Sequence, residues 1–107
     1  MSKLPNQYTS IKKRFKKFYD ASDKLGRAAR ASGPISKKNS HLVQLAAAAA
    51  IRSEGAVHSH TRRALQAGAK PAEIYHTIIL LSSTIGFPTA SAALSWADDV
   101  ITAHKKK

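Results

Sequence analysis

The sequence contains no cysteine, which excludes disulfide bonds, thiolate metal ligands and reactions that need a thiol nucleophile. Long apolar runs are also absent. The longest covers residues 45–51 and is mostly alanine, whereas a membrane-spanning helix needs about 20 apolar residues. Residues 1–10 lack the apolar core of a secretory signal. We therefore expect a cytoplasmic protein with no membrane span.

Acidic residues are scarce, and the basic residues that outnumber them are unevenly distributed. The 107 residues hold 18 Lys and Arg against six Asp and Glu, a formal net charge of +12. Residues 1–40 carry a net charge of +9, residues 41–104 a net charge of zero, and residues 105–107 the remaining +3. We expect one domain over residues 1–107, with a basic helical arm (1–35), a neutral core (36–104) and a basic tail (105–107). Dense Lys and Arg in the arm would give nonspecific affinity for polyanions.

The apolar residues recur at helical spacing, and the strict alternation typical of strands is missing. Ile11, Phe15, Phe18 and Tyr19 form one stripe, and we expect the aromatic side chains to be packed. The segment 71–83 is apolar on more than one face, which indicates burial in the core or in a subunit interface. The pattern predicts an all-α bundle of five to six antiparallel helices, with helices expected at 8–31, from 36 to about 50, and at 56–67, 71–83 and 89–104.

The run SEGAVHSHTRRALQAGAKPAEI, at residues 53–74, leads to a Gly-Phe-Pro hinge at 86–88 and an alanine-rich final helix. This order of features resembles the carboxymuconolactone decarboxylase family, which includes the alkyl hydroperoxidase D-like proteins. The resemblance covers about residues 36–101. It implies that the core has the alkyl hydroperoxidase D-like helical bundle and that the chain assembles with itself, as a homotrimer or homohexamer.

The resemblance also assigns positions to the redox chemistry of the family. Its redox-active members carry Cys-x-x-Cys followed by a His, and those positions are Ser53, Ala56 and His60 here. Because one thiolate must attack and another resolve, a thiol peroxidase or disulfide reductase is excluded. A Glu that supports proton relay in the redox members corresponds to His41. The decarboxylase branch lacks the Cys pair and keeps the His, so the resemblance implies that His60 is the catalytic acid or base.

Two residues near His60 are further catalytic candidates. Glu54 and His58 are four residues apart, so their side chains can meet on one helix face. Such a pair either orients a catalytic imidazole or is an ordinary surface pair. His58 and His60 point in different directions on a helix and cannot chelate one ion together. With only Glu54 and His41 as additional ligand candidates, we expect no metal and no cofactor.

Three arginines flank these residues and suit an anionic substrate. The guanidinium group binds carboxylates through two parallel hydrogen bonds, and a solvated helix face is the alternative interpretation. The candidates for substrate binding are Arg52, Arg62, Arg63 and His41. Their expected ligand is a small carboxylated metabolite, since the substrate of the family is an acidic lactone.

These features predict a carboxymuconolactone decarboxylase-like lyase that uses histidine acid–base chemistry for decarboxylation or isomerisation. Loss of both Cys positions leaves open a non-catalytic oligomeric binding protein whose site has decayed. The basic arm leaves open, in third place, a nucleic-acid accessory protein.

Overall fold

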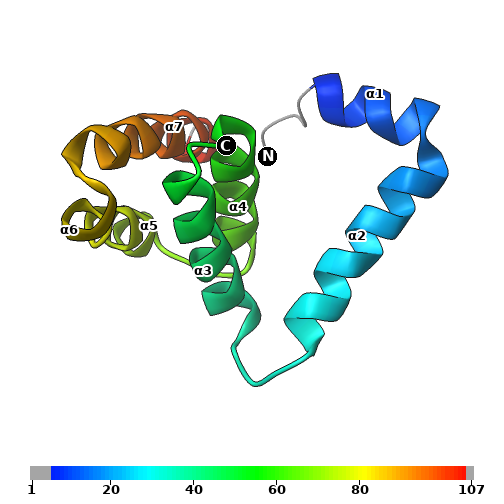
Figure 1. The fold of residues 1–107 in the computed structure, drawn as a ribbon, viewed down its shortest axis with the longest axis horizontal. Coiled ribbons are helices and arrows are strands. Elements are labelled where there is room, and N and C mark those ends of the chain that lie inside the picture. The colour runs from blue at the N-terminus through cyan, green and yellow to red at the C-terminus, as the bar shows by residue number, and fades with distance from the viewer. Residues whose placement is uncertain (1–5, 106–107) are drawn as a thin grey trace. The chain divides into compact units, whose positions relative to one another are not determined.

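The structure, a computed structural model, describes residues 6–105, and those residues form helices without strands, as the sequence predicts (Figure 1). The chain divides into two compact units, residues 1–35 and 36–107. Setting aside α6, which is a single turn, six helices remain. The helices are α1 (Asn6–Arg14), α2 (Lys16–Ala31), α3 (Lys37–Ala50), α4 (Glu54–Gln66), α5 (Pro71–Ile79), α6 (Ser82–Ile85) and α7 (Phe87–Lys105).

The first unit contains two helices where the sequence pattern predicted one continuous helix over 8–31. The helix is interrupted at Phe15, whose backbone is non-helical at φ −130° and ψ 58°. The interruption allows the rings of Tyr8 and Tyr19 to meet edge to face, with centroids 6.2 Å apart. In a straight helix eleven residues span about 16 Å, so this contact requires the break. No Gly or Pro occurs near Phe15, so the sequence contains no helix-breaking residue that would predict this interruption.

The apolar side of α2 is more exposed than expected. Phe15 and Phe18 are 53% and 65% exposed, and Leu25 is 71% exposed, so the aromatic stripe is not packed as a whole. Lys16 and Asp20 form an ion pair one turn apart, and Arg27 pairs with Asp23 in the same way. These pairs leave a surplus of positive charge on both helices of the unit.

The second unit is built around α4. This helix contacts α3, α5 and α7, and its buried residues lie on most of its circumference. The largest fully buried apolar side chains of the unit come from α3, α5 and α7 as well as from α4: Leu45, Val57, Ile74, Ile78 and Ile101. Figure 1 shows α3 and α4 side by side in green, with α7 packed against α4. The central position of α4 places its polar residues between neighbouring helices.

Helix boundaries in the second unit follow capping rules. The Ser36 side chain accepts a hydrogen bond from the Asn39 amide at the start of α3. Pro71 occupies the start of α5, and the Glu73 carboxylate accepts from the Lys70 amide at 2.9 Å. After α4, Gly68 adopts φ +100°, a conformation that favours glycine. The sequence predicted these boundaries.

The helix expected at 71–83 ends earlier. α5 stops at Ile79, and the Leu81 amide donates to the Ile78 carbonyl three residues back, which tightens the chain before the single turn of α6. Ile74 and Ile78 are buried, whereas Ile79 and Leu80 are exposed. Among the described residues, no helix combines the length and the apolar character needed to cross a bilayer.

Candidate functional site

Two histidines meet where α3 packs against α4. The Nδ1 atoms of His41 and His60 lie 3.4 Å apart, and the ring centroids are 5.6 Å apart. His41 is 1% exposed, whereas His60 is partly exposed. At this distance one of the two facing nitrogens can donate a hydrogen bond to the other, with the roles set by the tautomers of the rings. This arrangement can take up or release a proton at the more accessible ring.

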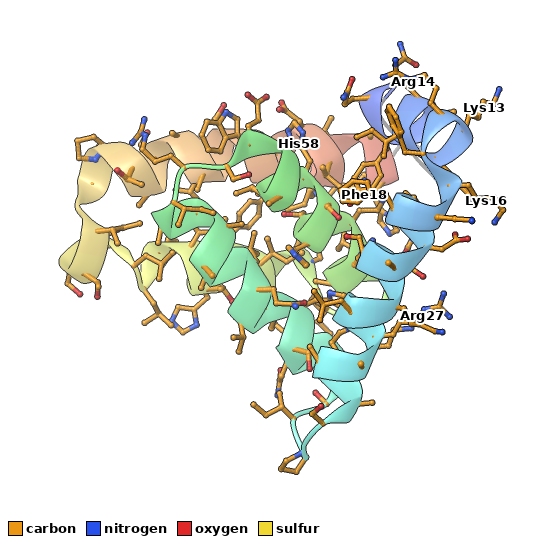
Figure 2. All side chains as sticks on the ribbon, turned by 45° about the vertical axis from the view of Figure 1, so that its right-hand side comes forward. Lys13, Arg14, Lys16, Phe18, Arg27 and His58 are labelled. Carbon is orange, nitrogen blue, oxygen red and sulfur yellow. The ribbon has the colours of Figure 1, made fainter. Side chains whose placement is uncertain are left out.

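A second polar group forms between α4 and α7. His58 Nε2 lies 3.1 Å from Asp99 Oδ2 and 3.9 Å from Glu54 Oε2. The expected pairing of Glu54 with His58 is therefore present as a long contact, and the closer partner is Asp99. Figure 2 shows His58 on the side of α4 that faces α7. Asp99 was not among the candidates from the sequence, because 41 residues separate it from His58.

The structure thus brings the candidate residues together in two groups. His60 and His41 lie between α3 and α4, whereas His58 contacts Glu54 on its own helix and Asp99 on α7. Residues two apart on a helix differ in direction by about 200°, which explains why His58 and His60 have different neighbours.

The positions that hold cysteine in redox members of the family serve the local fold. Ser53 is the N-cap of α4, and its side chain accepts from the Ala56 amide at 3.4 Å. Ala56 is partly buried and packs against the hydrophobic core. Neither residue offers a thiol, so the thiol chemistry of the redox members is absent from these positions.

The three arginines have different surroundings. Arg52 lies in the connection between α3 and α4 at φ +57°, and its Nη1 donates to Thr89 Oγ1 at 2.7 Å. Arg62 is only 8% exposed and follows His58 by one helical turn. Arg63 is partly exposed and follows His60 by three residues, on the same side of α4. Of the three, only Arg63 is both partly exposed and on the same side of α4 as His60.

Two buried oxygen atoms near the histidine pair lack a hydrogen-bond partner within residues 6–105: Gln44 Oε1 and Thr61 Oγ1. Gln44 follows His41 by three residues on α3, and Thr61 directly follows His60 on α4. Unpaired buried polar atoms are uncommon and costly in folded proteins. Gln44 was not among the candidates from the sequence, although its spacing from His41 places it on the same helix face.

Tyr75 and Asp98 connect α5 with α7 beside Asp99. The Tyr75 hydroxyl donates to Asp98 Oδ1 at 2.7 Å. This hydrogen bond to the neighbouring carboxylate raises the pKa of Tyr75 above its ordinary value, with smaller contributions from burial and from the negative charge itself. Adjacent aspartates of α7 therefore serve different helices, since Asp98 binds α5 and Asp99 binds α4.

The fold and its polar residues define a cysteine-free, all-α protein with a histidine pair between two antiparallel helices. The sequence matches the carboxymuconolactone decarboxylase family over residues 16–99, and the chain belongs to this family. The match includes α2, so it begins earlier than the resemblance noticed in the sequence. No curated protein matches the chain.

A solved structure has the same fold. The apo crystal structure of a carboxymuconolactone decarboxylase family protein from Legionella pneumophila is similar with a TM-score of 0.72 and 23% sequence identity. The similarity covers 88% of this chain and 87% of the Legionella chain. It supports the alkyl hydroperoxidase D-like helical architecture.

Proposed function

We propose that the protein is a histidine-dependent lyase or isomerase that acts on a small carboxylated metabolite. The observation that carries the proposal is the 3.4 Å contact between His41 Nδ1 and His60 Nδ1, which joins a buried imidazole to an accessible one. Membership of the carboxymuconolactone decarboxylase family supports the class of reaction. Glu54 and His58, the other catalytic candidates, belong to a separate polar group in which His58 contacts both Glu54 and Asp99.

In the proposed chemistry, the His60 imidazole transfers the proton and the His41 imidazole orients the His60 ring. In decarboxylation, the bond between carbon and carboxylate breaks, CO₂ leaves, and the bonding electrons delocalise into an adjacent carbonyl or conjugated system. His60 in its cationic form then delivers its proton to that carbon. In isomerisation, neutral His60 removes a proton from one carbon and returns it to another. His41 Nδ1 holds the facing nitrogen of His60 in a defined tautomer.

Arg63 shares a helix face with His60 and Gln44 shares one with His41, so these two residues are the proposed binding groups. The guanidinium of Arg63 would pair with a carboxylate, and a hydroxyl of the substrate would donate to Gln44 Oε1. Arg52 contributes less to this proposal because it binds Thr89 at the start of α7.

We expect the chain to form a homo-oligomer. Several large apolar side chains of the second unit are exposed, and self-association would bury them. They are Val43, Ile51, Ile79, Leu80 and Phe87. Light scattering coupled to size-exclusion chromatography tests this expectation directly, and a strictly monomeric chain at high concentration contradicts it.

Proton transfer can be tested with a panel of candidate substrates. The protein is incubated in D₂O with small carboxylic acids, lactones and keto acids, and proton NMR follows deuterium incorporation and CO₂ loss. His60→Ala and His41→Gln should each lower the rate for the active compound by about 10²- to 10⁴-fold. His76→Ala, at an exposed position on α5, is the matched control and should retain the rate.

Two results would contradict the proposal. One is a His60→Ala variant that keeps the wild-type rate. The other is saturable binding of a panel compound, seen by ligand-observed NMR, with no exchange or turnover, which would favour the non-catalytic binding protein.

A further inference from the structure

Glu54, His58 and Asp99 form a compact group of potential metal ligands. One ligand atom from each residue lies within 4.8 Å of the other two. Glu54 and His58 are one turn apart on α4, and Asp99 approaches from α7. The group therefore joins two helices through three side chains.

The spacing suits coordination of one ion. Donor atoms about 2.1 Å from a metal lie roughly 3.0 to 3.5 Å from one another in tetrahedral or octahedral geometry. His58 Nε2 is 3.1 Å from Asp99 Oδ2 and 3.9 Å from Glu54 Oε2, so a small rotation of the Glu54 side chain completes the arrangement. The side chains of Glu54 and Asp99 are 58% and 60% exposed, which lets this rotation occur and lets water fill the remaining positions.

The charge of the group points to the same ligand. The chain carries 18 Lys and Arg, yet within residues 6–105 the ion-pair partner of both carboxylates is the His58 imidazole rather than a Lys or Arg. Two carboxylates carry more negative charge than one imidazole can offset, and a divalent cation would neutralise the excess. The carboxylates of Glu54 and Asp99 therefore attract a cation at a position where the His58 imidazole can also coordinate it.

We propose that Glu54, His58 and Asp99 bind a divalent first-row transition-metal ion that links α4 to α7. One imidazole nitrogen and two carboxylate oxygens suit Zn²⁺, Co²⁺ or Mn²⁺, whereas Mg²⁺ and Ca²⁺ prefer oxygen ligands alone. The site differs from the histidine pair of the proposed function, since His41 and His60 lie between α3 and α4. The proposal differs from the sequence-based expectation of no metal because Asp99, which lies on another helix, supplies the third ligand.

The test uses the full chain without an affinity tag, dialysed against chelator and then titrated with Zn²⁺ by calorimetry. Co²⁺ is added in parallel, and its visible absorption reports the ligand geometry. We expect saturable binding of one ion per chain and an increase in melting temperature with Zn²⁺ concentration, because the ion binds the folded state. His58→Ala and Asp99→Asn should each weaken binding by about tenfold or more.

Matched controls separate this site from other sources of binding. Asp98→Asn changes the neighbouring aspartate by the same single charge, and His60→Ala removes the imidazole of the other group; both variants should bind Zn²⁺ like the wild type. All substitutions at the proposed site are on partly or fully exposed side chains, so circular dichroism should show native helix content. The absence of saturable binding overturns the proposal. So does binding that survives unchanged in His58→Ala, or binding that is lost only in His60→Ala.

Discussion

His58 and His60, two residues apart on α4, contact different helices. His58 Nε2 lies 3.1 Å from Asp99 of α7, whereas His60 Nδ1 lies 3.4 Å from His41 of α3. A central helix can serve two polar groups in this way because successive residues point in widely different directions. Each group can therefore be altered by substitution while the other remains intact.

The cap at the start of α5 makes stability depend on pH. The backbone hydrogen bond from Lys70 and the side-chain hydrogen bond from Lys38 lower the pKa of Glu73 below its ordinary value of 4.5. A lowered pKa in the folded state adds stability above the ordinary value, and this stability is lost as the pH falls through the folded value. We expect Glu73→Gln to lower the melting temperature at about pH 7, and the gap from wild type to shrink at about pH 3.

Thermal unfolding followed by circular dichroism measures this gap. Asp20→Asn, which removes an exposed ion pair with Lys16, is the control and should have a smaller effect at about pH 7. A gap for Glu73→Gln that stays constant down to about pH 3 would contradict the assignment.

Gly68 is the position where backbone conformation limits substitution. Its φ of +100° disfavours any residue with a Cβ atom, although no atom lies within 4 Å of where that Cβ would stand. Gly68→Ala should therefore cost about 1 to 2 kcal/mol through strain alone. Gly33→Ala also meets open space but without a positive φ, and it should be nearly neutral. Urea unfolding of both variants decides the point, and equal losses would show that the conformation of Gly68 is not responsible.

The hydrogen bond between Tyr75 and Asp98 should be visible in a titration. Because Asp98 raises the pKa of Tyr75, ionisation of this phenol is delayed relative to an ordinary tyrosine. The hydrogen bond then contributes stability below the ordinary value of 10.0, and this contribution is lost as the pH rises through the folded value. Absorbance near 295 nm, with Tyr75→Phe subtracted from wild type, isolates this group.

Asp98→Asn should move the titration of Tyr75 back toward its ordinary range, while Asp99→Asn should leave it in place. If both variants shifted it equally, the general charge of α7 would be the cause rather than this hydrogen bond.

The basic helices of the first unit should bind polyanions without sequence preference. Figure 2 shows Lys13, Arg14 and Lys16 extending outward from α1 and α2. Replacing Lys12 and Lys13 with Gln should make the salt dependence of DNA binding shallower, by up to about 0.9 in log–log slope for each phosphate that is no longer neutralised. Fluorescence anisotropy across a range of salt concentrations measures the slope. Replacing Lys37 and Lys105, in the second unit, is the charge-matched control; an equal change in both variants would show that only total charge matters.

The sequence was informative where a local rule determined the structure. Ser36, Pro71 and Gly68 mark helix ends because capping and backbone preferences act over a few residues. The break at Phe15 was not predictable, since it depends on contacts between side chains of α1 and α2 rather than on a helix-breaking residue. Asp99 was missed for a related reason: helical spacing identifies neighbours on one helix but does not say which residue of a distant helix packs against them.

The connection between α3 and α4 holds only three residues, 51–53, and Arg52 takes a left-handed backbone there. Because this connection is short, the two helices cannot shift relative to each other. The number of residues between the connection and each histidine therefore determines whether the two imidazoles face each other. An insertion of one amino acid between this connection and His60 would rotate the His60 side chain by about 100° around the axis of α4, away from His41. Length changes in these two helical stretches would therefore separate His41 from His60 even where the helices themselves stay intact.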